Sequence, residues 1–142
     1  MSAPSVAIVT GAADGIGWAT AQRLAADVDH VVVLDVRAQA ALERATELGH
    51  AHLGLACDVV SPESVKTAIR TVLERFGRVD TLVNNAGIGE QVTPTVDQDL
   101  AAFDRVLGVH LRGTFLMSRE AGAAMLGQGT GAIVNITSVA AF

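Results

Sequence analysis

Short apolar runs rich in β-branched residues alternate with alanine-rich helical segments along all 142 residues of this chain. Such alternation predicts right-handed βαβ crossovers and a parallel sheet with helices on both faces. The run Val-Val-Val-Leu at residues 31–34 is the clearest strand, since continuous apolar residues suit a parallel strand that is buried on both faces. The sequence therefore predicts an α/β fold with a doubly wound parallel sheet.

The same pattern predicts where each element lies. Strands are expected over residues 6–10, 30–35, 51–57, 80–83 and 132–137, and helices over 16–26, 38–48, 62–76, roughly 97–107 and roughly 110–126. The third helix has the clearest ends, because Ser61 is a typical N-cap, Pro62 suits the first helical position and Gly77 suits the C-terminal end. We therefore expect about five strands with flanking helices in a single domain over residues 1–142.

Composition and charge exclude several classes of protein. The net charge of −5 provides no basic surface for nucleic acid, and no apolar run approaches the roughly 18 residues of a membrane span. The N-terminus lacks the basic and apolar regions of a secretion signal. The only cysteine, Cys57, cannot form an internal disulfide, which favours the cytoplasm. His30, His50 and His52 lack metal-site spacing with acidic residues, so we interpret them as surface or loop residues and expect no metal.

A glycine-rich turn follows the first strand, with the sequence Thr-Gly-Ala-Ala-Asp-Gly-Ile-Gly at residues 10–17. Gly11 would allow the sharp exit from the strand, Gly15 would let the backbone approach a pyrophosphate, and Gly17 would let the helix pack closely on the sheet. The helix N-terminus would offer its amides to the phosphates. The alternative is a glycine-rich turn without a ligand. Its strand–turn–helix context favours a dinucleotide site, and hence a Rossmann-type fold.

Asp35 ends the second predicted strand, 18 residues after Gly17 and near the offset of about 20 expected for a ribose-binding acid. Its carboxylate would accept hydrogen bonds from the adenosine ribose and would repel a 2′-phosphate. Asp14 adds a second negative charge nearby, so both residues favour NAD over NADP. Arg37 points the other way, because a nearby arginine can neutralise a phosphate. A solvated carboxylate at the end of a strand is the alternative for Asp35.

With these residues in view, the chain resembles the short-chain dehydrogenase/reductase family. The resemblance is carried by the glycine turn, Asp58-Val59, the Asn-Asn-Ala-Gly segment at residues 84–87 and the Asn-Ile-Thr-Ser segment at residues 135–138. The glycine spacing differs from the G-x-G-x-x-G of other dinucleotide folds. A methyltransferase shares the fold, but the turn and the Asn-Asn-Ala-Gly segment speak against it.

The resemblance implies a role for each matched position. Asp58 would hydrogen-bond the adenine amino group with Val59 beside the ring, and Asn85 would lie nearest the ribose. The alternative is that the two asparagines mainly tie neighbouring strands together. Ser138 matches the catalytic serine, which would hydrogen-bond the substrate carbonyl or hydroxyl. The expected cofactor-binding residues are Gly11, Asp14, Gly15, Ile16, Gly17, Asp35, Asp58, Val59, Asn85, Ala86 and Gly87.

Two departures from the family pattern concern catalysis. The proton-donating tyrosine and its lysine, in a Tyr-x-x-x-Lys motif, would follow Ser138 past the end of this sequence, which contains no tyrosine and only one lysine, Lys66. We therefore expect a chain truncated at its C-terminus: a fragment, a truncated reading frame or a natural half-protein. His110 stands where most family members carry an asparagine, and it either takes part in a proton relay or packs in a helical bend.

The leading hypothesis is an NAD-dependent oxidoreductase that moves hydride between nicotinamide and an alcohol or carbonyl substrate; the substrate itself is not readable. The alternative is a non-catalytic nucleotide-binding or assembly module. A homo-oligomer is also expected, because the fifth strand would form an apolar edge of the sheet. The preceding helix adds an apolar stripe, predicted to consist of Leu111, Phe115, Gly122 and Met125.

Overall fold

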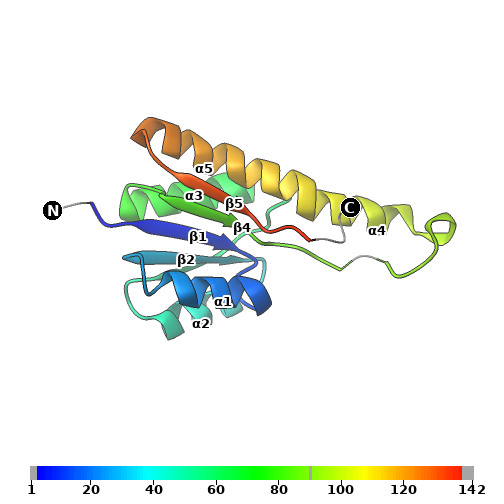
Figure 1. The fold of residues 1–142 in the computed structure, drawn as a ribbon, viewed down its shortest axis with the longest axis horizontal. Coiled ribbons are helices and arrows are strands. Elements are labelled where there is room, and N and C mark those ends of the chain that lie inside the picture. Colours follow the sequence, from blue (N-terminus) through cyan, green and yellow to red (C-terminus); the bar gives the residue numbers. More distant parts are fainter. Residues whose placement is uncertain (1–2, 90, 139–142) are drawn as a thin grey trace.

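Five parallel strands form a single sheet in the computed structural model, which describes residues 3–89 and 91–138 (Figure 1). The strands are β1 (Val6–Thr10), β2 (His30–Asp35), β3 (Leu53–Ala56), β4 (Thr81–Asn84) and β5 (Ala132–Asn135). Their order across the sheet is β3-β2-β1-β4-β5, so the chain winds outward from β1 first in one direction and then in the other. The predicted doubly wound parallel sheet is confirmed.

Helices cover both faces of this sheet. One face carries α1 (Gly15–Leu24) and α2 (Ala38–Leu48), and the other carries α3 (Pro62–Phe76) and α5 (Thr114–Gln128) (Figure 1). A 3₁₀ turn, η1 (Thr95–Asp97), precedes α4 (Leu100–Leu107), and a π-helical turn, η2 (Gly108–Gly113), joins α4 to α5. The helical segments from α4 to α5 thus follow one another without an intervening loop.

The central strands divide their side chains between two cores. In β2, Val32 and Leu34 pack in the core beneath α3 and α5, whereas Val31 and Val33 pack in the core beneath α1 and α2. All four side chains are fully buried, because a parallel strand with helices on both faces has no exposed side. The interpretation of residues 31–34 as a strand buried on both faces is therefore confirmed.

The ends of α3 agree with the capping signals. The Ser61 hydroxyl accepts a hydrogen bond from the Ser64 amide at 3.3 Å, Pro62 opens the helix, and Gly77 ends it in the left-handed region at φ 77°. Other helices differ from the prediction at their ends. Helix α1 begins one residue early, at Gly15, because the Asp14 carboxylate caps it. Helix α4 begins only at Leu100, because the cap is provided by Asp99.

Three strands also differ from their predicted ranges. Strand β3 begins at Leu53 rather than at residue 51, because the Val31 amide donates to the His52 ring instead of to a backbone carbonyl. Strand β4 lies one residue later than expected, and β5 ends at Asn135 rather than at residue 137. Strand β5 pairs with β4, whose last residue is Asn84, and the last bond between them runs from the Ile136 amide to the Asn84 carbonyl at 2.9 Å.

The π-helical turn is the main local feature that the pattern missed, since residues 110–126 were predicted as one regular helix. The turn places Gly113 against Val59, in the segment that follows β3, and a Cβ on Gly113 would lie 2.7 Å from Cγ2 of Val59.

The predicted apolar stripe of Leu111, Phe115, Gly122 and Met125 is corrected at Met125. This residue is 7% exposed and belongs to the core, whereas Leu111 and Phe115 are 69% and 60% exposed.

His52 gives the fold a pH-sensitive contact, so its interpretation as a surface or loop residue was incomplete. Its Nδ1 accepts a hydrogen bond from the Val31 amide at 2.9 Å, which only a neutral imidazole can do. Burial, and then the nearby charge of His30, lower the pKa of His52 below its usual value. Stability from this contact is therefore complete above about pH 6.5 and is lost as the pH falls through the lowered pKa.

We accordingly expect acidification from pH 7.5 to pH 5 to lower the free energy of unfolding through His52 by about 1 kcal/mol, the cost of leaving a buried donor unpaired. Urea unfolding at the two pH values measures this loss. The His52→Gln variant keeps an acceptor without a titrating ring, so it should lose less stability than the wild type. The exposed His50, changed to glutamine, is the control. Equal pH dependence in all three proteins would contradict the assignment.

Candidate cofactor-binding site

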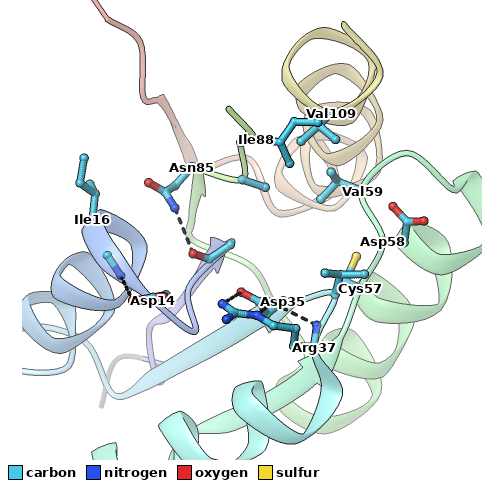
Figure 2. Close-up of a pocket in the computed structure, with 15 residues that line it drawn as sticks. Asp14, Ile16, Asp35, Arg37, Cys57, Asp58, Val59, Asn85, Ile88 and Val109 are labelled. Atoms are coloured by element: carbon cyan, nitrogen blue, oxygen red, sulfur yellow. Dashed lines mark hydrogen bonds and ion pairs between the residues drawn. The ribbon is translucent and has the colours of Figure 1, made fainter. Parts of the chain in front are cut away.

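A cavity of about 670 Å³ lies at the carboxyl ends of the strands, where the chain changes its winding direction between β1 and β4 (Figure 2). Ligands bind at such a switch point in open α/β sheets, and the volume is typical of ligand sites. In Figure 2, Asn85 and Ile88 lie on one side of the opening, with Asp35 and Arg37 on the other. The lining residues are Gly11, Asp14, Gly15, Ile16, Asp35, Val36, Arg37, Cys57, Asp58, Val59, Asn85, Ala86, Gly87, Ile88 and Val109.

The three glycines of the turn do different things. Gly11 has φ 61° and a Cβ there would lie 2.8 Å from the Ala86 Cα, so the strand exit needs glycine. Gly15 has φ 53° but no atom within 4 Å of its Cβ position, so its backbone faces open space in the cavity wall. Gly17 lies behind the turn and does not line the cavity; a Cβ would lie 2.3 Å from the Gly11 carbonyl oxygen. It packs α1 against the sheet.

The first turn of α1 offers backbone amides to the cavity. The Gly15 amide donates to the Asp14 carboxylate at 2.7 Å, and the first intrahelical bond runs from Trp18 to the Asp14 carbonyl. The amide of Ile16, a lining residue, has no partner among the described residues, and neither has the amide of Gly17 behind it. Free amides at the positive end of a helix stabilise an anion, so this turn fits a pyrophosphate. Asp14 itself acts as the helix cap.

Asp35 is almost fully buried at the other end of the cavity. Its carboxylate accepts hydrogen bonds from the Ala13 amide at 3.2 Å and from the Arg37 amide at 3.0 Å, and it forms an ion pair with the Arg37 side chain. Burial alone would raise the pKa of Asp35, but the hydrogen bonds from Arg37 and Ala13 outweigh it and lower the pKa below its usual value. Asp35 is therefore a negative charge at neutral pH.

The wall beside Asp35 comes from the segment that follows β3. The Cys57 amide donates to the Asp35 carbonyl at 2.8 Å, and this bond brings the segment alongside the end of β2. Asp58 is exposed, and one of its carboxylate oxygens accepts from the Val60 amide at 3.1 Å. Val59 is buried beneath the cavity, where the π-helical turn packs on it. An apolar floor beside an exposed carboxylate fits the flat ring and amino group of an adenine.

The loop after β4 is tied to the glycine turn by side-chain hydrogen bonds. The Asn85 side-chain amide donates to the carbonyls of Thr10 and Gly11, at 3.0 and 3.2 Å. The Thr10 hydroxyl accepts from the amides of Asn85 and Ala86 in return. Asn84 donates to Asn135 at 2.9 Å, and so links β4 to β5. Both asparagines thus join neighbouring strands, and Asn85 also lines the cavity.

The two predicted catalytic residues lie outside the cavity lining. His110 is exposed on the π-helical turn, with Nε2 at 3.1 Å from the Ile88 amide nitrogen and 2.9 Å from the Ile88 carbonyl oxygen. Its ring lies so close to Gly87 that a Cβ there would be 2.8 Å from the His110 Cε1. Ser138 is exposed, three residues beyond Asn135 at the end of β5. The structure does not bring these two side chains into direct contact with the cavity.

Five lining residues were not among the expected cofactor-binding residues: Val36, Arg37, Cys57, Ile88 and Val109. Four of them adjoin a residue that was predicted, and Arg37, which was expected only as a possible partner of a phosphate, follows Val36. Residue type gave no signal for the three aliphatic residues, because such residues have many roles. Strand ends alone could have indicated them, since everything that follows a strand at this edge of the sheet faces the same space.

Cys57 is 3% exposed although it lines the cavity. Burial raises the pKa of the Cys57 thiol to about 11. Because the thiolate is the reactive form, we expect iodoacetamide at pH 8 to modify the folded chain at least about tenfold more slowly than the urea-unfolded chain. Mass spectrometry over time measures both rates on this single cysteine. Equal rates would show that the thiol is accessible and ionisable in the folded protein.

Within residues 3–89 and 91–138, histidine, cysteine and acidic side chains nowhere gather in the groups of three or more that a metal ion needs. In the same residues, every helix is too short or too polar to cross a bilayer.

Comparison with known proteins agrees with this geometry. The sequence profile of the short chain dehydrogenase family matches residues 5–142. The D-threitol dehydrogenase of Mycolicibacterium smegmatis is 44% identical over 139 residues, which cover 96% of this chain and 53% of that protein. The 2-(R)-hydroxypropyl-CoM dehydrogenase of Xanthobacter autotrophicus is 44% identical over 145 residues, covering 95% and 56%. The chain thus spans about half the length of the curated relatives that it matches.

Two solved structures of dehydrogenases and reductases share the fold of this chain. A 3-ketoacyl-(acyl-carrier-protein) reductase from Brucella melitensis, complexed with NADH, superposes with a TM-score of 0.90 at 36% identity, covering 96% of this chain and 57% of that one. An NAD⁺-bound xylitol dehydrogenase superposes with a TM-score of 0.91 at 34% identity, covering 96% and 54%. With its family profile, its relatives and its fold in agreement, this chain belongs to the short chain dehydrogenase family.

Proposed function

We propose that this chain binds NAD in the cavity and is the cofactor-binding part of an oxidoreductase. The observation that carries the proposal is the buried, ionised Asp35 carboxylate at one end of a cavity whose other end is the glycine turn. The free amides of α1 fit the pyrophosphate, Asp35 fits the adenosine ribose, and Asp58 with Val59 fits the adenine. When bound, NAD would supply the hydride acceptor for oxidation of an alcohol, or NADH the donor for reduction of a carbonyl.

The charges around the cavity support NAD over NADP. Three carboxylates line it, from Asp14, Asp35 and Asp58, against a single guanidinium, from Arg37. That guanidinium is already paired with Asp35. A 2′-phosphate on the adenosine ribose would bring further negative charge beside Asp35, and like charges in contact are unfavourable. The solved relatives in complex with NADH and NAD⁺ support the same preference.

Ser138 would hydrogen-bond the oxygen of the substrate, and His110 would hold the Gly87–Ile88 wall of the cavity. The related dehydrogenases point to a small alcohol or carbonyl substrate. We further propose a cytoplasmic homo-oligomer. The single cysteine, Cys57, which cannot form an internal disulfide, supports the location, and the exposed apolar side chains of Leu111 and Phe115 support the association. Sedimentation over a concentration series tests the association, and a monomer at tens of micromolar would contradict it.

Binding of NADH is the direct test of the proposed function. Trp18, the only tryptophan, lies in α1 just after the turn that lines the cavity, so bound NADH should quench its fluorescence. We expect saturable quenching that NAD⁺ competes away and NADP⁺ competes away more weakly. A chain that binds neither dinucleotide at millimolar concentration would contradict the proposal, and tighter binding of NADP⁺ would contradict the preference.

A turnover assay separates an oxidoreductase from a non-catalytic nucleotide-binding module. Hydride transfer to a ketone needs a proton as well, and the 142-residue chain contains no tyrosine to supply it. We expect NADH oxidation by the chain alone to stay below about 1 s⁻¹, the lower end of typical enzyme turnover. The proposed activity requires that a protein which continues past residue 142 oxidises NADH with a ketone faster than the 142-residue chain alone.

A further inference from the structure

The Asp35 carboxylate already has a full set of hydrogen-bond donors. Its Oδ1 accepts from the Arg37 amide and from Arg37 Nε, both at 3.0 Å. Its Oδ2 accepts from the Ala13 amide at 3.2 Å and from Arg37 Nη2 at 3.4 Å. An ionised carboxylate has about four acceptor positions, two on each oxygen. All four are occupied before any ligand arrives, so a ribose hydroxyl has to replace one of these donors.

The four donors differ in how easily they can leave. The Ala13 and Arg37 amides belong to the backbone, in the buried turn and at the N-cap of α2, and they are held there by the fold. The other two belong to the Arg37 side chain, which is 55% exposed while the Asp35 side chain is 7% exposed. The guanidinium can therefore rotate into solvent, and its departure would free one acceptor position on each oxygen. The two hydroxyls of a ribose need two such positions.

We propose that Arg37 is a specificity-determining residue whose guanidinium occupies the ribose-binding positions of Asp35 until NAD displaces it. This inference rests on the proposed function, because it assumes that the ribose reaches Asp35. In Figure 2, the guanidinium lies against the Asp35 carboxylate at the cavity wall. In the free protein, Arg37 thus competes with NAD for the same oxygens.

Displacement of the guanidinium from Asp35 would also change how Arg37 affects the binding of NADP. Once it leaves Asp35, the guanidinium is an unpaired cation that still belongs to the cavity lining. Arginine binds phosphate through paired N–H donors, so a 2′-phosphate would gain a partner that offsets its repulsion by Asp35. Arg37 therefore weakens binding of NAD and strengthens binding of NADP, and both effects narrow the preference that the carboxylates create.

Two substitutions of Arg37 separate its hydrogen bonds from its charge. Arg37→Met keeps a long side chain but removes the donors and the charge, whereas Arg37→Lys keeps the charge without the paired donors. Since exposed ion pairs contribute little, the dissociation constant for NAD⁺ should fall by about two- to fivefold in both variants. The dissociation constant for NADP⁺ should rise about tenfold in Arg37→Met and change less in Arg37→Lys. Arg70→Met, a remote exposed arginine on α3, is the charge control.

Titration calorimetry with NAD⁺ and NADP⁺ measures these constants, and thermal unfolding verifies that each variant folds. A second readout follows Arg37 directly: its Nε–H resonance, assigned by its absence in Arg37→Lys, should lose its carboxylate-bonded position when NAD⁺ saturates the wild type. Weaker or unchanged NAD⁺ binding in both variants would overturn the inference, since Arg37 would then orient Asp35 or attract the pyrophosphate. An unmoved resonance in the saturated protein would overturn it too. A wild type that binds neither dinucleotide would instead refute the proposed function.

Discussion

Replacing Gly17 with alanine is expected to lower the free energy of unfolding by about 3 kcal/mol or more, the upper range for overpacking a tight site. The added Cβ would lie 2.3 Å from the Gly11 carbonyl oxygen and 2.4 Å from the Asn85 side-chain amide. Both atoms belong to the turn and to the loop that line the cavity, so α1 would have to move away from the sheet there. Binding of NADH, measured by Trp18 fluorescence, should be lost with the stability.

Two other glycines make the Gly17 result interpretable. Gly15→Ala adds a Cβ that meets no atom within 4 Å but sits at φ 53°, so it should cost only about 1–2 kcal/mol of backbone strain. Gly122→Ala lies within α5 and also meets nothing within 4 Å, so it should be neutral or stabilising by up to about 1 kcal/mol. Urea unfolding ranks the three variants. A Gly17→Ala protein as stable as Gly122→Ala would contradict the close packing of α1.

Replacing Asp35 with alanine is expected to weaken binding of NAD⁺ by tenfold or more, since a hydrogen bond to a charged group contributes about 1.5–3 kcal/mol. The same change leaves the Ala13 amide without its acceptor and releases Arg37. Binding of NADP⁺ should change much less, because its repulsion by Asp35 disappears. The ratio of the two dissociation constants, measured by calorimetry, should therefore move toward NADP by at least about tenfold.

Asp104→Ala is the matched control for this variant, since Asp104 is an exposed acid on α4 away from the cavity. A pH series adds a second constraint. Because the pKa of Asp35 is lowered, its charge is present above the usual carboxyl range and is lost only as the pH falls through that lowered pKa. The difference in NAD⁺ affinity between the wild type and Asp35→Ala should therefore stay constant from pH 8 to pH 5. Equal loss of affinity in Asp104→Ala would show that net charge, not Asp35, controls binding.

Local signals were sufficient where the physical cause is local. The ends of α3 follow from Ser61, Pro62 and Gly77, because a cap, a fixed φ and a left-handed residue act within a few positions of the chain. The fully apolar run in β2 likewise indicated burial on both faces. The glycine turn and Asp35 could be predicted as two ends of one site, because the carboxyl ends of parallel strands share one edge of the sheet.

Other details depend on partners that are distant in the sequence. Strand β3 starts late because a side chain, His52, takes the hydrogen bond that its backbone would have made to β2. Met125 belongs to the core because it lies with Leu116, Met117 and Ala121 on the buried face of α5, whereas Phe115 of the same helix is exposed. A stripe that runs from Leu111 into α5 assumes a constant rotation per residue, and the π-helical turn at residues 108–113 breaks that assumption.

The sequence by itself determined the order of strands and helices, the turn that fits a pyrophosphate and the acid that fits a ribose, because each depends on residue types at fixed short spacings. Only the tertiary structure decided how those groups are partnered. It placed Gly17 behind the turn rather than in the cavity, and it gave the Asp35 carboxylate three hydrogen bonds from Arg37 and a fourth from the Ala13 amide. The reason is physical: spacing along the chain determines which groups can meet, but a hydrogen bond depends on distances and directions that exist only once the strands are packed.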